Sequence, residues 1–343
     1  YMKIYFKIGL FFLLLPIHSQ DIGFSNILKE VYPDKNEFNY PKNYKVNTAR
    51  NSYSDVNIII KTRVGDIIDF NAFSETLNYI QFNNVKDVPI EENTGLDSRT
   101  EQFKGVINPH VIRRAPFRVF EILKPVNNYI IAETKYSLLN LKIYIPEKID
   151  SGNHLVKLSF KIGSKIFDLK LKVNVYDYII PKLSESNFFY TNWFNLGKME
   201  EYHGVERWTD EWYSMLDKYA KVMAEGRQNC IIIPGELIYL NDGKFQLDEK
   251  KMISFINIFR KYGFKYFESP HLLNRGANDD WGNPELKTRL KKVGYYSDEG
   301  KNEIASITYK IRDFTEKYNL KNQWLQHIAD EPTSINAQCY VDV

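Results

Sequence analysis

The feature that most constrains this chain is a regular alternation of apolar and polar side chains near its middle. Every second residue is apolar in three stretches, 139–145, 156–162 and 167–175, and most of the residues between are lysine or another polar type. Because successive side chains of a strand point to opposite faces, each stretch predicts a strand with one buried face. Turn residues at 150–153 and 163–164 separate the stretches, so we expect one antiparallel sheet that packs on a second sheet as a β-sandwich.

The sequence on either side is assigned to the same domain, which we expect to span residues 21–180. Short apolar runs at 56–60 and 129–132 predict further strands, and the lysine-rich face of the alternating stretches is expected to be solvated. Residues 21–55 show little periodicity and are expected to be loosely structured, whereas the polar stretch 85–115 gives no assignment.

The pattern changes after Pro181, where apolar runs alternate with helical patterns. Buried strands are predicted at 188–194, at 230–234, at 264–267 and from 324 onward. Three helices are predicted between them: Thr209 caps the first, Asp248 starts the second, and Ile304, Ile307 and Ile311 lie on the apolar face of the third. Such a series predicts a parallel sheet, and a TIM-type (β/α)8 barrel fits it best. A closed barrel needs eight strands, so we expect residues 181–343 to be its first half, in a chain truncated at its C-terminus.

The first twenty residues resemble a secretory leader. Lys3 and Lys7 precede an apolar run at 8–17, which is followed by small or polar residues, so residues 1–20 are predicted to be a signal peptide and the protein to be exported. The run is too short to span a bilayer, and no membrane span is predicted in the mature chain. Cys230 and Cys339 provide neither a disulfide framework nor a zinc-ligand spacing, and Cys230 is expected to be a small core residue.

Charge and composition narrow the classes of partner. The net charge of +3 comes from 46 basic and 43 acidic residues dispersed along the chain, so nothing indicates nucleic-acid binding. Aromatic residues make up 15% of the chain, which supplies cores and also suits the stacking of sugar rings.

Two adjacent acids, Asp330 and Glu331, follow the last predicted strand, and Pro332 ends the regular structure after them. In parallel-sheet folds the chemistry gathers at the carboxyl ends of the strands. Two carboxyls in one sheltered pocket repel each other, which raises the pKa of at least one and suits a general acid. Neighbouring side chains of a strand face opposite sides, so both reach one pocket only where the strand breaks up, as Pro332 indicates by restricting the backbone of Glu331. The alternative is a solvated loop after a strand.

Several motifs, in this order, resemble those of glycoside hydrolase family 123 and the wider DUF4091 group. The resemblance covers about residues 135–335 and rests on the predicted antiparallel sandwich and on Asn192-Trp193-Phe194, Trp208-Thr209-Asp210-Glu211-Trp212, Asn229-Cys230-Ile231-Ile232-Ile233-Pro234, Phe267-Glu268-Ser269-Pro270-His271-Leu272-Leu273 and His327-Ile328-Ala329-Asp330-Glu331-Pro332. The last motif is the most specific. One departure is that Arg275-Gly276-Ala277 stands where relatives often have Trp-Gly-Ala, with Trp281-Gly282 only after it, so the sugar bound can differ.

The resemblance implies an exo-acting β-N-acetylgalactosaminidase that acts on a glycan or glycolipid with a terminal N-acetylhexosamine. It implies that Glu331 is the acid/base, that Asp330 holds the acetamide N–H, and that no metal or organic cofactor is needed. Ordinary glycosidases place two carboxyls on opposite sides of the sugar, about 5 Å or about 6.5–9.5 Å apart, which a vicinal pair cannot do. A vicinal pair can instead serve a mechanism in which the substrate's own 2-acetamido group is the nucleophile.

Six further residues are candidates for the sugar pocket. Asn192 and Trp193 end the first predicted strand, and His271 and Trp281 follow the third; for the two tryptophans, burial in the core is an equal alternative. Glu268 is a candidate hydroxyl ligand or a structural ion-pair partner. His327 is expected to be a hydrogen-bonded histidine of the barrel that holds the residues around the sugar in place.

Two other functions stay open on sequence grounds. One is a relative of the DUF4091 group that acts on a different glycoside. The other is a non-catalytic glycan-binding protein of the cell surface that keeps the barrel as a platform.

Overall fold

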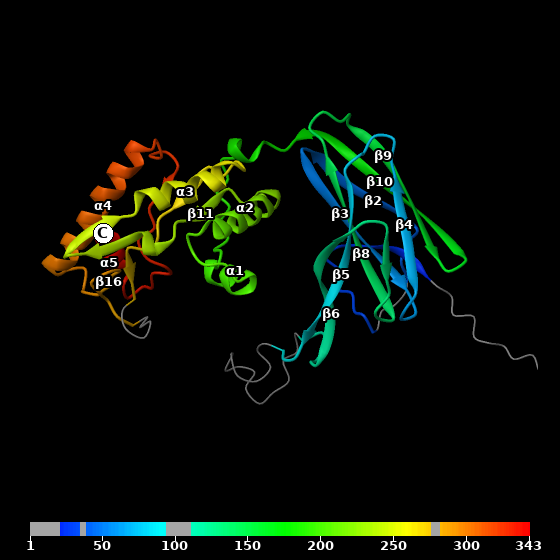
Figure 1. Cartoon of the computed structure of the whole chain (residues 1–343), viewed down its shortest axis with the longest axis horizontal. Helices are drawn as coiled ribbons and strands as arrows, with labels where there is room; N and C mark the ends of the chain where they lie inside the picture. Colours follow the sequence, from blue (N-terminus) through cyan, green and yellow to red (C-terminus); the bar gives the residue numbers. More distant parts are fainter. Residues whose placement is uncertain (1–20, 35–38, 94–110, 276–281) are drawn as a thin grey trace, which may run out of the picture. The chain divides into compact units, whose positions relative to one another are not determined.

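The computed structural model describes four stretches of the chain, residues 21–34, 39–93, 111–275 and 282–343. Within it the chain divides into two compact units, one that ends at Ile180 and one that begins at Pro181 (Figure 1). The predicted signal peptide lies outside the described residues.

The first unit consists of two five-stranded sheets. One has the order β1 (Ile22–Ser25), β3 (Ser52–Lys61), β8 (Tyr136–Ile145), β5 (Ile80–Ile90) and β6 (Phe117–Val126). The other has the order β2 (Asn43–Arg50), β10 (Lys165–Ile179), β9 (Gly152–Ile162), β4 (Ile67–Phe73) and β7 (Tyr129–Ile131). Neighbouring strands are antiparallel except for β2 and β10. Buried side chains of both sheets form one apolar cluster, in which the ring centroids of Phe70 and Phe82, from different sheets, lie 4.5 Å apart.

The three alternating stretches do not lie in one sheet, so that prediction was wrong. β8 pairs with β3 and β5, whereas β9 and β10 pair with each other in the other sheet. The two-residue turn 163–164 holds β9 and β10 as a hairpin, but the longer connection 146–151 carries the chain from β8 to the other sheet. β8 is also buried on both faces, since Tyr136 and Leu138 belong to a second apolar cluster.

The described part of residues 21–55 contains β1, β2 and the start of β3, contrary to the expectation of a loose segment. All four residues of β1 are buried, and β1 requires Gly23, because a Cβ there would lie 2.4 Å from the carbonyl oxygen of Tyr40. β2 is nowhere fully buried, and only Tyr44 and Val46, which alternate with exposed residues, pack against the apolar cluster. The stretch that had no assignment contains the end of β5, and its residues 94–110 lie outside the described ranges.

The second unit is built on a parallel sheet in the order β11 (Cys230–Ile232), β14 (Tyr266–Glu268) and β17 (Trp324–Leu325). The helices are α1 (Leu196–His203), α2 (Asp210–Glu225), α3 (Glu249–Arg260), α4 (Asp298–Lys317) and α5 (Ala337–Asp342), with single 3-10 turns at Leu183–Glu185 and Gly235–Leu237. Two hairpins, β12 (Ile238–Asn241) with β13 (Lys244–Leu247) and β15 (Leu273–Asn274) with β16 (Lys287–Thr288), lie in the connections after β11 and β14. Within the described stretches, no helix is both long and apolar enough to span a bilayer.

The three predicted helices are confirmed as α2, α3 and α4. The Thr209 side chain accepts a hydrogen bond from the Trp212 N–H, so the predicted cap of α2 is present. α3 begins where predicted, with Asp248 as its N-cap, which accepts a hydrogen bond from the Lys251 N–H. α4 starts before its apolar face, with Ser297 as N-cap. These local signals succeed because capping and helical periodicity depend on residues only a few positions apart.

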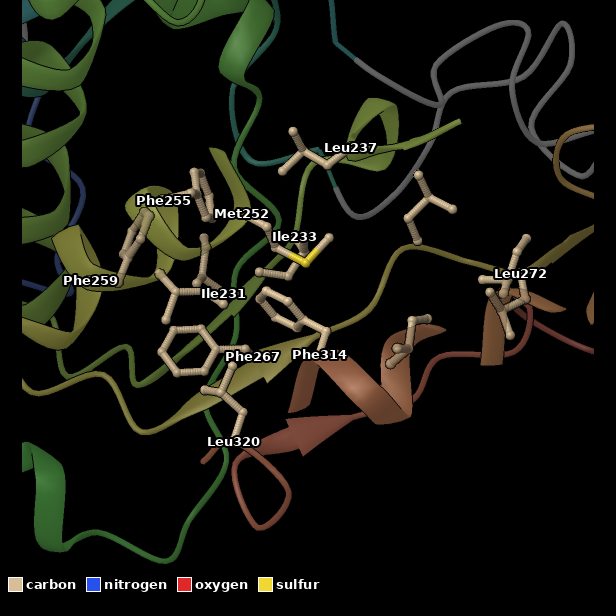
Figure 2. Close-up of a cluster of buried hydrophobic side chains, with 14 of the residues drawn as sticks. Ile231, Ile233, Leu237, Met252, Phe255, Phe259, Phe267, Leu272, Phe314 and Leu320 are labelled. Carbon is tan, nitrogen blue, oxygen red and sulfur yellow. The ribbon is translucent and has the colours of Figure 1, made fainter. Parts of the chain in front are cut away.

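The helices bury their apolar faces against the parallel sheet (Figure 2). Ile231 of β11 and Phe267 of β14 lie in one apolar cluster with Phe255 and Phe259 of α3 and with Phe314 of α4. Each of these side chains is at most 1% exposed. This core fixes the strands, and therefore the loops that leave their carboxyl ends.

Two predicted strands are far shorter than expected. The segment 188–194 contributes only one parallel bridge, from Thr191 to Cys230, because the Asn229 side chain bonds the Tyr190 N–H and the Phe188 carbonyl in place of a ladder. The strand from Trp324 ends at Leu325.

Candidate active site at the carboxyl ends of the parallel strands

The carboxyl ends of the parallel strands gather most of the predicted site residues. Parallel strands end at one edge of a sheet, so the segments that follow Thr191, β11, β14 and β17 come together there. A cavity of about 540 Å³ opens among the first three of these segments. It is lined by Trp193, Phe194, Asn195, Leu196, Gly197, Arg207, Ile231, Ile232, Ile233, Pro234, Gly235, Phe255, Pro270, His271 and Arg289. Neither Asp330 nor Glu331 is among the lining residues.

Four of the predicted residues form one chain of contacts at this edge. Glu268 Oε1 lies 2.5 Å from His327 Nδ1, and the His327 ring lies 4.0 Å, centroid to centroid, from the ring of His271. The Trp193 ring lies 5.4 Å from His271 and 6.2 Å from His327. The carboxylate, the two imidazoles and the indole therefore form a continuous group, from β14 to the wall of the cavity.

The electrostatics of this group favour a neutral His271. Burial lowers the pKa of His271, the neighbouring His327 and Arg289 lower it further, and the charge of Asp330 opposes them. Its Nε2 is buried and has no hydrogen-bond partner among the described residues. A neutral imidazole with one unsatisfied nitrogen is suited to a hydrogen bond with a ligand hydroxyl.

Ser269 holds the chain beyond β17 in place. Its hydroxyl is fully buried and accepts hydrogen bonds from the His327 N–H at 2.8 Å and from Gln326 Nε2 at 2.7 Å. The Ile328 carbonyl accepts the N–H groups of Leu272 and Leu273 at 3.0 and 2.9 Å. After Leu325 the chain is no longer a regular strand, and the Ser269 hydroxyl takes the place of a backbone carbonyl as the acceptor of the His327 N–H. This bond holds the segment that leads to the two acids.

The two acids differ in their surroundings. Asp330 is half-buried, and it lies close enough to His271 for its charge to act on that pKa. The Glu331 side chain is 66% exposed, and its Oε2 lies 3.7 Å from Nη1 of Arg275, whose own side chain is 11% exposed. Glu331 has a φ of +44°, a left-handed conformation that few residues other than glycine adopt. The regular alternation of an extended strand is therefore broken at this residue.

Two of the predicted residues do not join the group. The Asn192 side chain is exposed and donates to the Tyr190 hydroxyl at 2.9 Å. It is not among the contacts that join Trp193, His271, His327 and Glu268. Trp281 lies outside the described residues.

Sequence reasoning missed two arginines of the cavity. Arg207 bonds the carboxylates of Glu200 and Glu236, and Arg289 follows the hairpin β15–β16. No local signal identifies Arg289, because the connection after β14 reaches the cavity only through the pairing of β15 with β16, which have two residues each.

Cys230 is not a nucleophile in this arrangement. Burial, with the nearby charge of Glu268, raises the pKa of Cys230 to about 12, although a hydrogen bond with Thr191 opposes the shift. The thiol therefore stays protonated at neutral pH, as the prediction of a small core residue requires. In the described stretches no three His, Cys, Asp or Glu side chains are grouped so that they could hold a metal ion.

No family model matches the sequence, and no curated protein matches it. Among solved structures, the chain is similar to a family 123 glycoside hydrolase from Clostridium perfringens that was studied for glycolipid glycan hydrolysis, with a TM-score of 0.72 over 94% of this chain and 12% sequence identity. This chain spans 61% of the length of that structure. The chain thus has a family 123-like fold, with antiparallel and mixed sheets. A DUF4466 family protein from Parabacteroides merdae matches 46% of this chain and 46% of its own, at 12% identity and a TM-score of 0.25, which is too low to carry an argument.

Proposed function

We propose that this protein is an exported glycoside hydrolase, built as a β-sandwich followed by the first half of a (β/α)8 barrel. The observation that supports the proposal most is the group formed by Trp193, Glu268, His271 and His327, which lies with the acid pair at the carboxyl ends of the parallel strands. Enzymes with such barrels carry out their chemistry at this edge. The family 123-like fold adds the reaction class, since the similar structure is that of a glycoside hydrolase.

The proposed substrate is a glycan or glycolipid with a terminal N-acetylhexosamine. In the proposed mechanism Glu331 donates a proton to the departing glycosidic oxygen, while the carbonyl oxygen of the 2-acetamido group attacks the anomeric carbon. Asp330 accepts a hydrogen bond from the acetamide N–H and stabilises the positive charge of the oxazolinium ion that forms. Glu331 then removes a proton from the water that opens this ion.

The residues around the acids support this division of roles. Glu331 is exposed at this edge, where its carboxyl is open to a bound sugar, and its Oε2 lies 3.7 Å from Nη1 of Arg275. Asp330 is the more buried acid and lies beside neutral His271, whose free Nε2 is suited to a sugar hydroxyl. Trp193 is 54% exposed and offers an apolar face to a sugar ring.

The proposal is tested by the release of chromophore from an aryl β-N-acetylgalactosaminide, measured on this chain and on the complete product of the gene that encodes it. Glu331→Gln is expected to lower kcat by about 10²–10⁴-fold, the usual contribution of a general acid. Asp330→Asn is expected to lower it to a similar degree, because it removes the charge that stabilises the oxazolinium ion.

Glu316→Gln is the matched control, since Glu316 lies exposed on α4, away from the strand ends, and this variant is expected to keep the wild-type rate. A second substrate, the same aryl glycoside with a hydroxyl in place of the 2-acetamido group, tests the nucleophile. Equal cleavage of both substrates would contradict substrate assistance. Wild-type rates in both acid variants would contradict the assigned roles.

A non-catalytic glycan-binding protein is the second candidate, and one observation favours it. The cavity is lined by Trp193 and His271 but by neither acid, as a binding site without chemistry would be. Binding of N-acetylhexosamine glycans on an array, together with no hydrolysis by the complete gene product, would decide for this candidate.

A further inference from the structure

Arg289 is fixed at the wall of the cavity. Its N–H donates to the Leu272 carbonyl at 2.9 Å, which holds the backbone. Its guanidinium lies against Gly235, where an added Cβ would fall 1.7 Å from Nη2. The guanidinium therefore occupies the space that a side chain at residue 235 would need.

The guanidinium makes little use of its donors. Among the described residues its only hydrogen bond runs from Nη1 to the His271 carbonyl at 3.5 Å, the upper limit for such a bond, and it forms no ion pair. Arg207, in the wall of the same cavity, bonds both Glu200 and Glu236. The two arginines thus differ sharply: two carboxylates balance the charge of Arg207, whereas no carboxylate of the described residues bonds Arg289.

The electrostatic setting explains why an anion would bind there. Burial lowers the pKa of Arg289, and the charge of Glu236 opposes this shift. A guanidinium nevertheless stays protonated at any physiological pH, and a sheltered cation without a bonded anion is costly. Because the Glu236 carboxylate is bonded to Arg207, it acts on Arg289 only from a distance.

We propose that the cavity binds a sugar that carries an anionic group, a sulfate or a carboxylate, with Arg289 as the residue that selects it. The planar fork of arginine matches both oxyanions through paired hydrogen bonds. Trp193 offers the apolar face for the ring, and about 540 Å³ is enough for a monosaccharide with its substituent. This inference rests on the proposed function and narrows it to acidic glycans.

The test is isothermal titration of the protein with N-acetylgalactosamine, its 6-sulfate and galacturonic acid. At least one charged sugar is expected to bind about tenfold more tightly than the neutral one, as hydrogen bonds to a charged group imply, and the tighter of the two identifies the anion. Arg289→Gln is expected to bring the ratio of the charged sugar's affinity to the affinity of neutral N-acetylgalactosamine close to one. Arg289→Lys keeps the charge without the fork, so an intermediate ratio is expected.

Gly235→Ala provides an independent variant, because it keeps the arginine but displaces its guanidinium. The ratio of charged-sugar to neutral-sugar affinity is therefore expected to fall below that of the wild type in this variant as well. Arg312→Gln, on the exposed face of α4, is the matched control and is expected to keep the wild-type ratio. Thermal melts establish that each variant is folded.

Three results overturn the inference: equal binding of charged and neutral sugars, binding of none of the three, or a preference that survives Arg289→Gln. The aryl glycoside assay separates this inference from the proposed function. Hydrolysis without a preference for charged sugars refutes only the inference, and a preference without hydrolysis by the complete gene product refutes only the proposed activity.

Discussion

Glu268→Gln is expected to destabilise the second unit by about 2 kcal/mol, because it weakens the contact that anchors the site. Glu268 is 8% exposed, and its Oε1 lies 2.5 Å from His327 Nδ1. Glutamine keeps the shape and an acceptor but loses the charge, which removes about 1 kcal/mol of a charge-assisted bond. Its amide also brings a buried donor without a partner, which costs about 1 kcal/mol more. For a domain of this size, such a loss lowers Tm by roughly 4–8 °C.

A double-mutant cycle with His327→Gln measures the pair directly. All five tryptophans of the chain lie after Pro181, so urea unfolding followed by tryptophan fluorescence reports on the second unit. The expected coupling energy is about 1.5–3 kcal/mol. Glu316→Gln, an exposed glutamate of α4, serves as control and is expected to change stability by less than about 0.5 kcal/mol. A coupling energy below about 0.5 kcal/mol would show that the two residues act independently and would refute the reasoning.

Three further predictions concern pH, capping and thiol chemistry. The folded-state pKa of His271 is lowered, so the stability that it contributes above the ordinary value of about 6.5 is expected to decline as the pH falls towards the folded-state pKa. Urea midpoints between pH 7.5 and pH 5.5, each about a unit from that value, should fall less in His271→Asn than in the wild type, and equal slopes would contradict this. Thr209→Ala is expected to cost about 1 kcal/mol through the lost α2 cap, measured by urea unfolding, whereas Thr209→Ser should retain most of it. Burial raises the pKa of both Cys230 and Cys339, to about 12 for Cys230, so Ellman's reagent near the ordinary thiol pKa of about 8.5 is expected to label neither until urea unfolds the chain, and rapid native labelling would contradict their burial.

The limits of prediction in the first unit follow from the range of the interactions. The alternation in 139–175 identified the strands, because a side chain's face depends only on its neighbours. It could not identify the pairing of β8 with β3, since that register joins Val56 to Leu141 across a separation that no local pattern encodes. The length of the 146–151 connection was the only local sign that β8 and β9 lie in different sheets. A loop of that length can join neighbouring strands of one sheet or strands of two sheets, so it did not decide between them.

The site divides in the same way. Glu268 and His271 could be proposed from their positions near a strand end and His327 from its place within the last predicted strand, and the three do meet. Arg289 could not be proposed, because its place depends on the hairpin β15–β16 and on the lack of a side chain at Gly235. Asn192 stays a prediction: the strand that it was expected to end is reduced to one bridge, and its side chain donates to the Tyr190 hydroxyl.

The regular strand ends at Leu325, so the alternation of side chains that a strand imposes does not extend to the acid pair. If the strand continued, Asp330 and Glu331 would face opposite sides of the sheet, and only one could serve a ligand at this edge. The Ser269 hydroxyl accepts the hydrogen bond of the His327 N–H, so this sheltered backbone donor keeps a partner although the strand pairing has ended. The left-handed φ of Glu331 then turns the chain between the two acids, at a backbone cost of about 1–3 kcal/mol. Strain of this size persists only where the surrounding contacts hold it, and here the bonds of Ser269 and Ile328 to the neighbouring segments do so.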